Sequence, residues 1–314
     1  MGHRIRYYAP GVRYYEVIAK CCGDEMLMRP DPVAIALIAQ ALANACKKHK
    51  SVCVVAVCFV SNHYHIILAV MCDEDAWKIS EFLKTLNQTI AQDLNVHRER
   101  GGHFFGGKPK ILPILDDAAL ADRMTYTHAQ PIHHGLVERA EDWIGLSSFR
   151  AVCDGKSSLD VPYFDERAWR EAGSRPEDVA EHTTTVSIPL TAPFAWSASS
   201  DSERRAAQSA HEQSVRDRER EKNAERNHGD RRALPKASSY AKTDPFSRPT
   251  GPRNDAPQPW AHGSDEAVAS YRSAYSLMLA AYRAASAKFR ATGTLGIFPA
   301  GTFPPWASPT PLTA

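Results

Sequence analysis

Hydrophobic residues near the start of the chain follow the repeats of three strands. Residues 12–19 (VRYYEVIA) are rich in β-branched and aromatic side chains, which favour extended structure. Residues 52–60 (VCVVAVCFV) form a continuous apolar run, which is typical of a central strand covered on both faces. A turn at Ser61 and Asn62 separates this run from the strand predicted at residues 63–70.

Two amphipathic helices are predicted around these strands. Residues 32–48 contain Ala, Ile and Leu with almost no helix breakers, and Asp31 precedes them in the N-cap position. Residues 75–97 place apolar side chains at helical spacing, in a stripe made of Ile79, Phe82, Leu83, Leu86, Ile90 and Leu94.

A third helix follows a glycine-rich loop that is predicted at residues 101–110. The helix begins near Asp116 and runs towards Gln130. Pro131 is expected to end it, because proline lacks the backbone N–H that a helix interior needs.

The character of the chain changes after about residue 165. Residues 201–232 contain nine Lys or Arg and eight Asp or Glu, a composition that predicts a solvated helix or a disordered linker. We therefore divide the chain into an N-terminal domain, an irregular connector, a charged and then Pro/Ser-rich linker, and a C-terminal helix with a proline-rich tail. Their ranges are residues 1–150, 151–200, 201–263 and 264–314.

Composition narrows the function only slightly. The formal net charge is +2, so charge alone gives almost no evidence for a nucleic-acid partner. The seven cysteines form no CxxC pair, which favours reduced core thiols over a disulfide framework or a zinc ribbon. No apolar run approaches the roughly 18 residues of a membrane span, and the N-terminus lacks an apolar secretory segment. We therefore expect a cytoplasmic protein without a membrane partner.

The first candidate for chemistry is the pair His63 and His65. Residues i and i+2 of a strand project from the same face, so both imidazoles could converge on one cation. With 13 histidines in the chain, roughly half an occurrence of this spacing is expected by chance. Two histidines with only a structural role are therefore the alternative.

The second candidate is the pair Tyr126 and Gln130. Residues i and i+4 share a helix face, so a phenol and an amide oxygen could approach one point. The alternative is a half-buried aromatic residue followed by a solvated helix end.

Several motifs within residues 1–150, which follow one another along the chain as they do in the family, resemble those of REP-associated tyrosine transposases and the wider superfamily of HUH single-strand DNA transposases. Residues 126–143 (YTHAQPIHHGLVERAEDW), followed by Ser147-Ser148-Phe149, resemble the region around the family's tyrosine. Residues 59–65 (FVSNHYH) resemble its histidine strand, and residues 102–108 (GHFFGGK) its glycine–phenylalanine stretch.

The resemblance implies an α+β, ferredoxin-like fold: an antiparallel sheet with helices on one face. It implies that His63, His65 and Gln130 hold Mg²⁺ or Mn²⁺ and that Tyr126 is the nucleophile, which forms a 5′-phosphotyrosine. The family usually has Asn-Pro where this chain has Gln130-Pro131, so Asp122 is an alternative oxygen ligand. The implied partner is single-stranded DNA that contains a hairpin, bound by a monomer or a homodimer.

Basic and aromatic residues in the N-terminal segment and in the glycine-rich loop could contact DNA phosphates and stack on bases. These candidates are Arg4, Arg6, Arg13, Phe104, Lys108 and Lys110. The alternative for each aromatic residue is a place in the core. Two other functions stay open, namely a DNA-binding regulator of the same fold that does not cut, and a metal-dependent nuclease that uses water instead of Tyr126.

Overall fold

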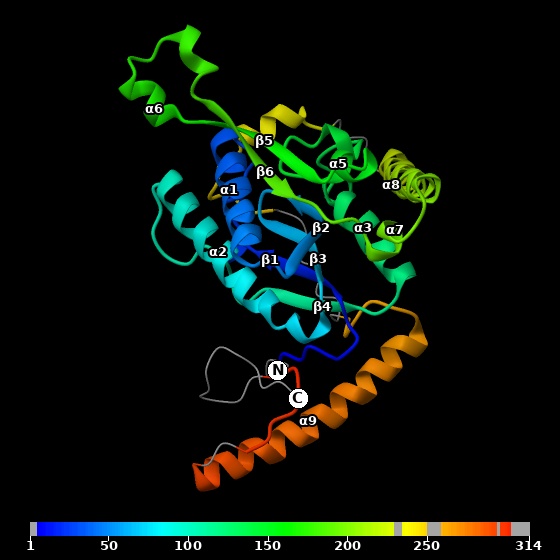
Figure 1. Cartoon of the computed structure of the whole chain (residues 1–314). Helices are drawn as coiled ribbons and strands as arrows, with labels where there is room; N and C mark the ends of the chain where they lie inside the picture. Colours follow the sequence, from blue (N-terminus) through cyan, green and yellow to red (C-terminus); the bar gives the residue numbers. More distant parts are fainter. Residues whose placement is uncertain (1–4, 229–233, 250–258, 294–295, 303–314) are drawn as a thin grey trace.

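The computed structural model describes residues 5–228, 234–249, 259–293 and 296–302. Among these residues, four strands form one antiparallel sheet in the order β2-β3-β1-β4 (Figure 1). The strands are β1 (Tyr14–Lys20), β2 (Val52–Phe59), β3 (His63–Val70) and β4 (Lys110–Ile114). Helix α1 (Pro32–Lys48) joins β1 to β2, and α2 (Lys78–His97) joins β3 to β4. This β-α-β-β-α-β order with that strand arrangement is ferredoxin-like, so the predicted fold class is confirmed.

Helices cover both faces of the sheet. The hydroxyl of Tyr64 on β3 donates to Asn87 on α2 at 2.6 Å. The next side chain, His65, faces the opposite way and lies against Tyr126 on α3 (Asp117–His128), with ring centroids 5.5 Å apart. Helices α1 and α2 therefore lie on one face as expected, and α3 forms a layer on the other.

The helix that carries Tyr126 begins where the sequence predicts and ends earlier. Asp116 caps it by accepting a hydrogen bond from Ala119 N at 2.8 Å. It ends at His128, and a second short helix, α4 (Gln130–His133), follows directly. The prediction that Pro131 ends the helix at Gln130 is wrong, because this proline sits in the first turn of α4, where its missing N–H has no helical partner to lose.

Strand β4 is absent from the sequence prediction, which assigned Lys110 to a loop. It is only five residues long and contains Pro113. It lies at the edge of the sheet, the position in which a strand tolerates proline.

Residues 151–200 are more regular than predicted. They form a hairpin of β5 (Ser158–Phe164) and β6 (Thr183–Pro189) that packs on α1. The expectation of an irregular connector is wrong over this hairpin. Three short helices flank or connect its strands: α5 (Phe149–Cys153), α6 (Glu166–Glu171) and α7 (Phe194–Ser197). Single 3-10 turns lie at Cys22–Asp24, Asp73–Asp75, Ala140–Asp142, Pro176–Val179 and Ala237–Lys242.

The charge run after residue 200 folds as one long helix, α8 (Asp201–His228), which packs on α3, α4 and α5 (Figure 1). Val215 is completely buried, and the buried carboxylate of Glu219 accepts from Ala140 N at 2.7 Å. His211 contacts His128 of α3 through ring nitrogens 2.9 Å apart. Of the two predicted states, the helix is therefore the one observed, and it is docked on the domain.

The last long helix, α9 (Asp265–Thr292), extends away from the sheet at one end of the molecule (Figure 1). The hydroxyl of Tyr275 donates to Ile5 O at 3.0 Å, which ties α9 to the N-terminal segment. Residues 229–233 and 250–258 of the predicted linker, and 303–314 of the predicted tail, lie outside the described residues. No helix in the described ranges is long and apolar enough to cross a membrane.

Protonation of the histidine pair between α3 and α8 should weaken the fold. Burial lowers the pKa of His211 to about 4, and burial together with His211 lowers the pKa of His128. In the unfolded chain both titrate near 6.5. Between these values the unfolded state binds more protons, so stability falls as pH falls below about 6.5.

We therefore expect His211→Gln to flatten the pH dependence of the free energy of unfolding. From pH 7 to 4.5, wild type should lose up to about 3 kcal/mol more than the variant in urea titrations. His103→Gln, in an exposed loop, is the control and should follow wild type. Equal pH slopes for wild type and His211→Gln would contradict the expectation.

Candidate functional site

Two histidines of the central strand β3 point into the layer between the sheet and α3. His63 and His65 lie on the same face, and their ring centroids are 5.4 Å apart. Only 6% and 4% of their surfaces are exposed. The predicted convergence of the two imidazoles is therefore present in the structure.

Tyr126 and Gln130 approach these histidines from α3 and α4. The half-buried ring of Tyr126 lies against His65, and Gln130 Oε1 is 3.2 Å from His63 Nε2. Gln130 Nε2 also donates to Tyr126 O at 3.3 Å. The spacing of four residues keeps both side chains on one face, although the helix is interrupted between them.

The outer nitrogen of each imidazole has an oxygen partner. His63 Nδ1 lies 2.8 Å from Asn62 Oδ1, and His65 Nδ1 lies 2.9 Å from Glu16 Oε1. Because a carboxylate only accepts, His65 Nδ1 is the nitrogen that donates to Glu16, and Nε2 is the nitrogen that remains to bind a metal in the neutral ring. Burial, and then the nearby His65 and His134, lower the pKa of His63 well below its usual range. His63 is therefore neutral at physiological pH, which is the state that binds metal.

The ring of Tyr126 is flanked by two further side chains. The guanidinium carbon of Arg123 lies 4.4 Å from the ring centroid, and the His133 ring lies 4.9 Å away. Burial and nearby cationic side chains lower the pKa of His133 to about 4, so this histidine is neutral. His133 and His134, which no sequence pattern singles out, also lie here, with the His134 ring 4.8 Å from that of His63.

Glu16 is a component of the site that sequence reasoning missed. It lies on β1 with 1% of its surface exposed. Burial alone would raise its pKa, but contacts with His262 and His65 hold the pKa at about 2. The available signal was a single acidic residue inside an apolar, aromatic strand (YYEVIA), where an unpaired charge is costly.

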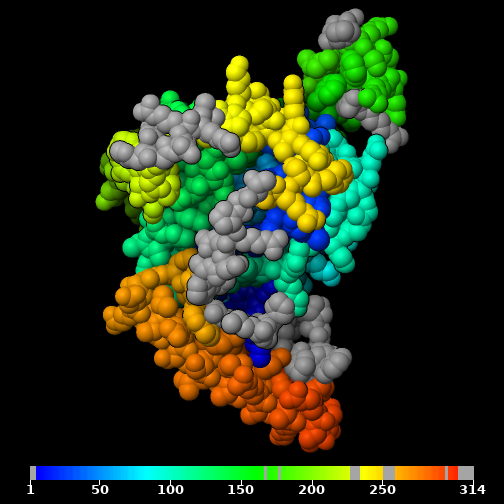
Figure 2. All heavy atoms as spheres, turned by 180° about the vertical axis from the view of Figure 1, so that it is seen from behind, coloured from blue at the N-terminus to red at the C-terminus, as the bar shows by residue number. Residues whose placement is uncertain are grey.

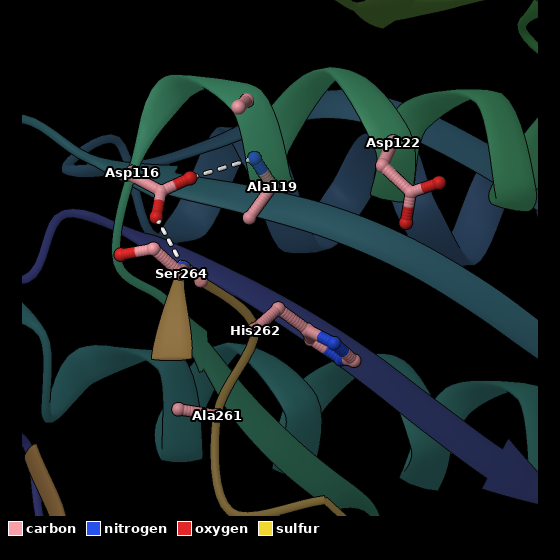
Figure 3. A pocket seen from close by; sticks show the side chains of 8 residues that line it. Asp116, Ala119, Asp122, Ala261, His262 and Ser264 are labelled. Carbon is pink, nitrogen blue, oxygen red and sulfur yellow. Dashed lines mark hydrogen bonds between the residues drawn. The ribbon is translucent and has the colours of Figure 1, made fainter. Parts of the chain in front are cut away.

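His262 reaches this network from the C-terminal part of the chain. Its Nε2 lies 2.7 Å from Glu16 Oε2, although the ring N–H is not aimed at that oxygen. Figure 3 shows His262 with Asp116 and Ser264 beside a pocket of about 580 Å³ that α3 also lines. Asp122, the alternative oxygen ligand, lines the same pocket and pairs with Arg123 and Arg218.

Another C-terminal segment, residues 234–249, crosses the back of the domain, where Figure 2 shows it in yellow over the N-terminal part. Arg29 Nη1 donates to Thr243 O at 2.5 Å, and Met26 N donates to Ser247 O at 3.1 Å. The segment predicted as a linker is therefore attached to the domain.

The predicted DNA contacts separate into groups. Lys108 and Lys110 are exposed, and they lie near the end of the sheet that carries His63. Lys20 lies at the same end, because it pairs with His63 in the register of β1 and β3. Burial, and then the charge of Lys20, lower the pKa of Lys110. This end of the sheet is therefore basic.

The other residues predicted to contact DNA are bonded within the protein, buried in the core or outside the described residues. Arg13 lies at the other end of β3, where it donates to Val70 O and Met71 O. Arg6 donates to Ser80 at 2.7 Å. Phe104 is 2% exposed and belongs to the core, so its prediction as a base-stacking residue is wrong. Arg4 lies outside the described residues.

Solved structures that are similar to this chain include two proteins described as transposases. A REP-associated tyrosine transposase bound to a REP hairpin is 17% identical, with a TM-score of 0.40, over 49% of this chain and 86% of that chain. A protein from Deinococcus radiodurans assigned as a transposase is 17% identical, with a TM-score of 0.28, over 39% of this chain and 93% of that chain. No family model and no curated protein matches the chain. The fold assignment rests on the strand order of this chain, not on these likenesses.

Proposed function

We propose that this protein is a transposase that cleaves and rejoins single-stranded DNA through a covalent link to Tyr126. The observation that carries the proposal is the convergence of His63, His65, Gln130 and Tyr126 on one layer beside β3. The motif resemblance of residues 1–150 supports the same function. All four side chains lie together within one subunit, so this arrangement needs no residue from a second copy.

The separation of one proposed ligand pair is compatible with an octahedral cation such as Mg²⁺ or Mn²⁺. Two neighbouring ligands at about 2.1 Å from such an ion lie about 3 Å apart. His63 Nε2 and Gln130 Oε1 are separated by 3.2 Å. Within the described residues, no group of three His, Cys, Asp or Glu side chains could hold a metal, so the amide of Gln130 is needed as the third ligand.

His63, His65 and Gln130 would then hold a metal with three neutral ligands. A metal bound there supplies the Lewis acidity that polarises the scissile phosphate. Neutral ligands do not offset its charge, and imidazole with amide oxygen suits Mn²⁺ well.

Tyr126 would act as the nucleophile. Its hydroxyl oxygen forms a bond to phosphorus while the bond from phosphorus to the 3′ oxygen breaks, and that oxygen takes up a proton as a free 3′-hydroxyl. The product is a 5′-phosphotyrosine, and attack by a 3′-hydroxyl reverses the step and rejoins DNA. The Arg123 guanidinium lies over the ring and places a positive charge beside the proposed nucleophile.

The basic end of the sheet suggests the path of the DNA strand. Lys20, Lys108 and Lys110 lie at the end that carries His63 and can contact successive phosphates. A hairpin beside the cleaved strand is part of the proposed substrate, on the basis of the motif resemblance.

Replacing the nucleophile discriminates this function from hydrolysis by water. We expect Tyr126→Phe to abolish the covalent protein–DNA adduct and to reduce strand cleavage by more than about 1,000-fold. The measurement uses denaturing gels with labelled single-stranded DNA from the flanks of the gene, with Mn²⁺ present. Tyr163→Phe, on the remote hairpin, is the control. Continued cutting by Tyr126→Phe would favour the nuclease that uses water.

Removing either histidine tests the metal site. We expect His63→Ala and His65→Ala each to weaken Mn²⁺ binding by more than about 100-fold, because a direct ligand matters more than the groups around it. Isothermal titration calorimetry without DNA measures this, and His103→Ala is the exposed control. Wild-type protein that binds single-stranded DNA in the presence of Mn²⁺ but does not cut it would favour the DNA-binding regulator.

A further inference from the structure

The carboxylate of Glu16 is a buried charge on β1, which lies between β3 and β4. Removing a carboxylate from water costs several kcal/mol unless partners compensate. Three cationic or ionisable groups surround Glu16. His65 Nδ1 is 2.9 Å away, His262 Nε2 is 2.7 Å away, and Arg123 Nη1 is 3.9 Å away. Each belongs to a different element of the fold.

The contact with His65 determines how that imidazole is presented. Glu16 Oε1 accepts from His65 Nδ1, which fixes the tautomer and the plane of the ring. The lone pair then resides on Nε2, the nitrogen that remains for a metal. Ligand histidines generally rely on such a carboxylate, and its loss typically weakens metal binding about 10- to 100-fold.

The contact with His262 is held in place by the backbone around it. His262 N donates to Pro113 O, and Leu115 N donates to His262 O, each at 2.8 Å. These bonds add a parallel bridge at the free edge of β4. Ser264 N also donates to Asp116 Oδ2 at 2.7 Å (Figure 3). The backbone is therefore held at His262 itself and again at Ser264, two residues later.

Gly263 allows this close approach. A Cβ atom at this position would lie 3.0 Å from Leu115 Cβ and 3.2 Å from Asp116 Oδ2. The segment therefore fits tightly against the β4–α3 turn.

We propose that Glu16 and His262 are positioning residues of the metal centre: Glu16 orients His65 through a hydrogen bond, and His262, in contact with Glu16 Oε2, limits where the carboxylate can lie. This inference rests on the proposed function and extends it to the C-terminal part of the chain. The centre is then not confined to residues 1–150. It requires a side chain that follows β3 by almost 200 residues.

Metal affinity in the full-length protein tests the proposal without reference to DNA cleavage. We expect Glu16→Ala to raise the Kd for Mn²⁺ about 10- to 100-fold. Glu16→Gln should lose less affinity, because its amide oxygen can still accept from His65 Nδ1. His262→Ala should weaken binding in the same direction, by a smaller factor. Calorimetry at fixed pH gives the Kd, and thermal unfolding is measured in parallel.

A second readout follows the tautomer of His65 directly. Two-bond ¹H–¹⁵N spectra of histidine-labelled protein without metal should show the Nδ1–H form in wild type and Glu16→Gln. In Glu16→Ala that form should lose its predominance. His97→Ala is the matched control, since His97 Nε2 makes a comparable 3.0 Å contact with Asp31 away from the site.

The outcomes separate this proposal from the one on which it rests. Wild-type protein that fails to bind Mn²⁺ contradicts the proposed metal centre itself. Wild-type binding with unchanged Kd values in Glu16→Ala and His262→Ala, even if both unfold earlier, overturns the positioning role and leaves the centre standing. The same loss of affinity in His97→Ala would also overturn it. If Glu16→Ala does not fold, Glu16→Gln and His262→Ala decide.

Discussion

Burial of both faces of β3 is the constraint on which the rest of the structure depends. All its residues are buried, and the pleat sends consecutive side chains into opposite layers. One layer is filled by Tyr64 and aliphatic residues that contact α1 and α2. The other receives two imidazoles, whose ring nitrogens need partners once water is excluded. Asn62, Glu16 and Gln130 provide those partners from three separate elements.

The same constraint couples the histidine side and the tyrosine side of the site electrostatically. Glu16 stays ionised in the interior because imidazoles and a guanidinium surround it. Arg123 is shared, since it lies near Glu16 and also over the ring of Tyr126. A shift of α3 would therefore disturb the histidine side and the tyrosine side together. Helix α8 opposes such a shift by packing along the outer surface of α3.

Local patterns predicted much of the fold and half of the site. Helices α1 and α2 and strands β2 and β3 have strong periodicity or continuous apolar runs, and all four form close to the predicted positions. His63 and His65 are two residues apart on a strand, and Tyr126 and Gln130 are four residues apart along a helical segment. The local geometry of each segment therefore places the two side chains of a pair on one face. The short edge strand β4 and the mostly exposed β5–β6 hairpin lack such a signal. Glu16 and His262 escaped prediction because register and tertiary packing bring them together. Phe104 was misassigned because an aromatic residue in a glycine-rich loop reads alike whether it points inward or outward.

The attachment of the His262 segment to the β4–α3 turn has a consequence for synthesis on the ribosome. Asp116 and Ser264 are 148 residues apart, so the sheet can assemble long before its last edge partner exists. At roughly 5 to 20 residues per second, the interval is about 7 to 30 s. During that time the nascent chain holds a folded sheet whose buried Glu16 still lacks one of its neighbours. Completion of this centre thus has to wait for the synthesis of a segment 148 residues beyond the β4–α3 turn.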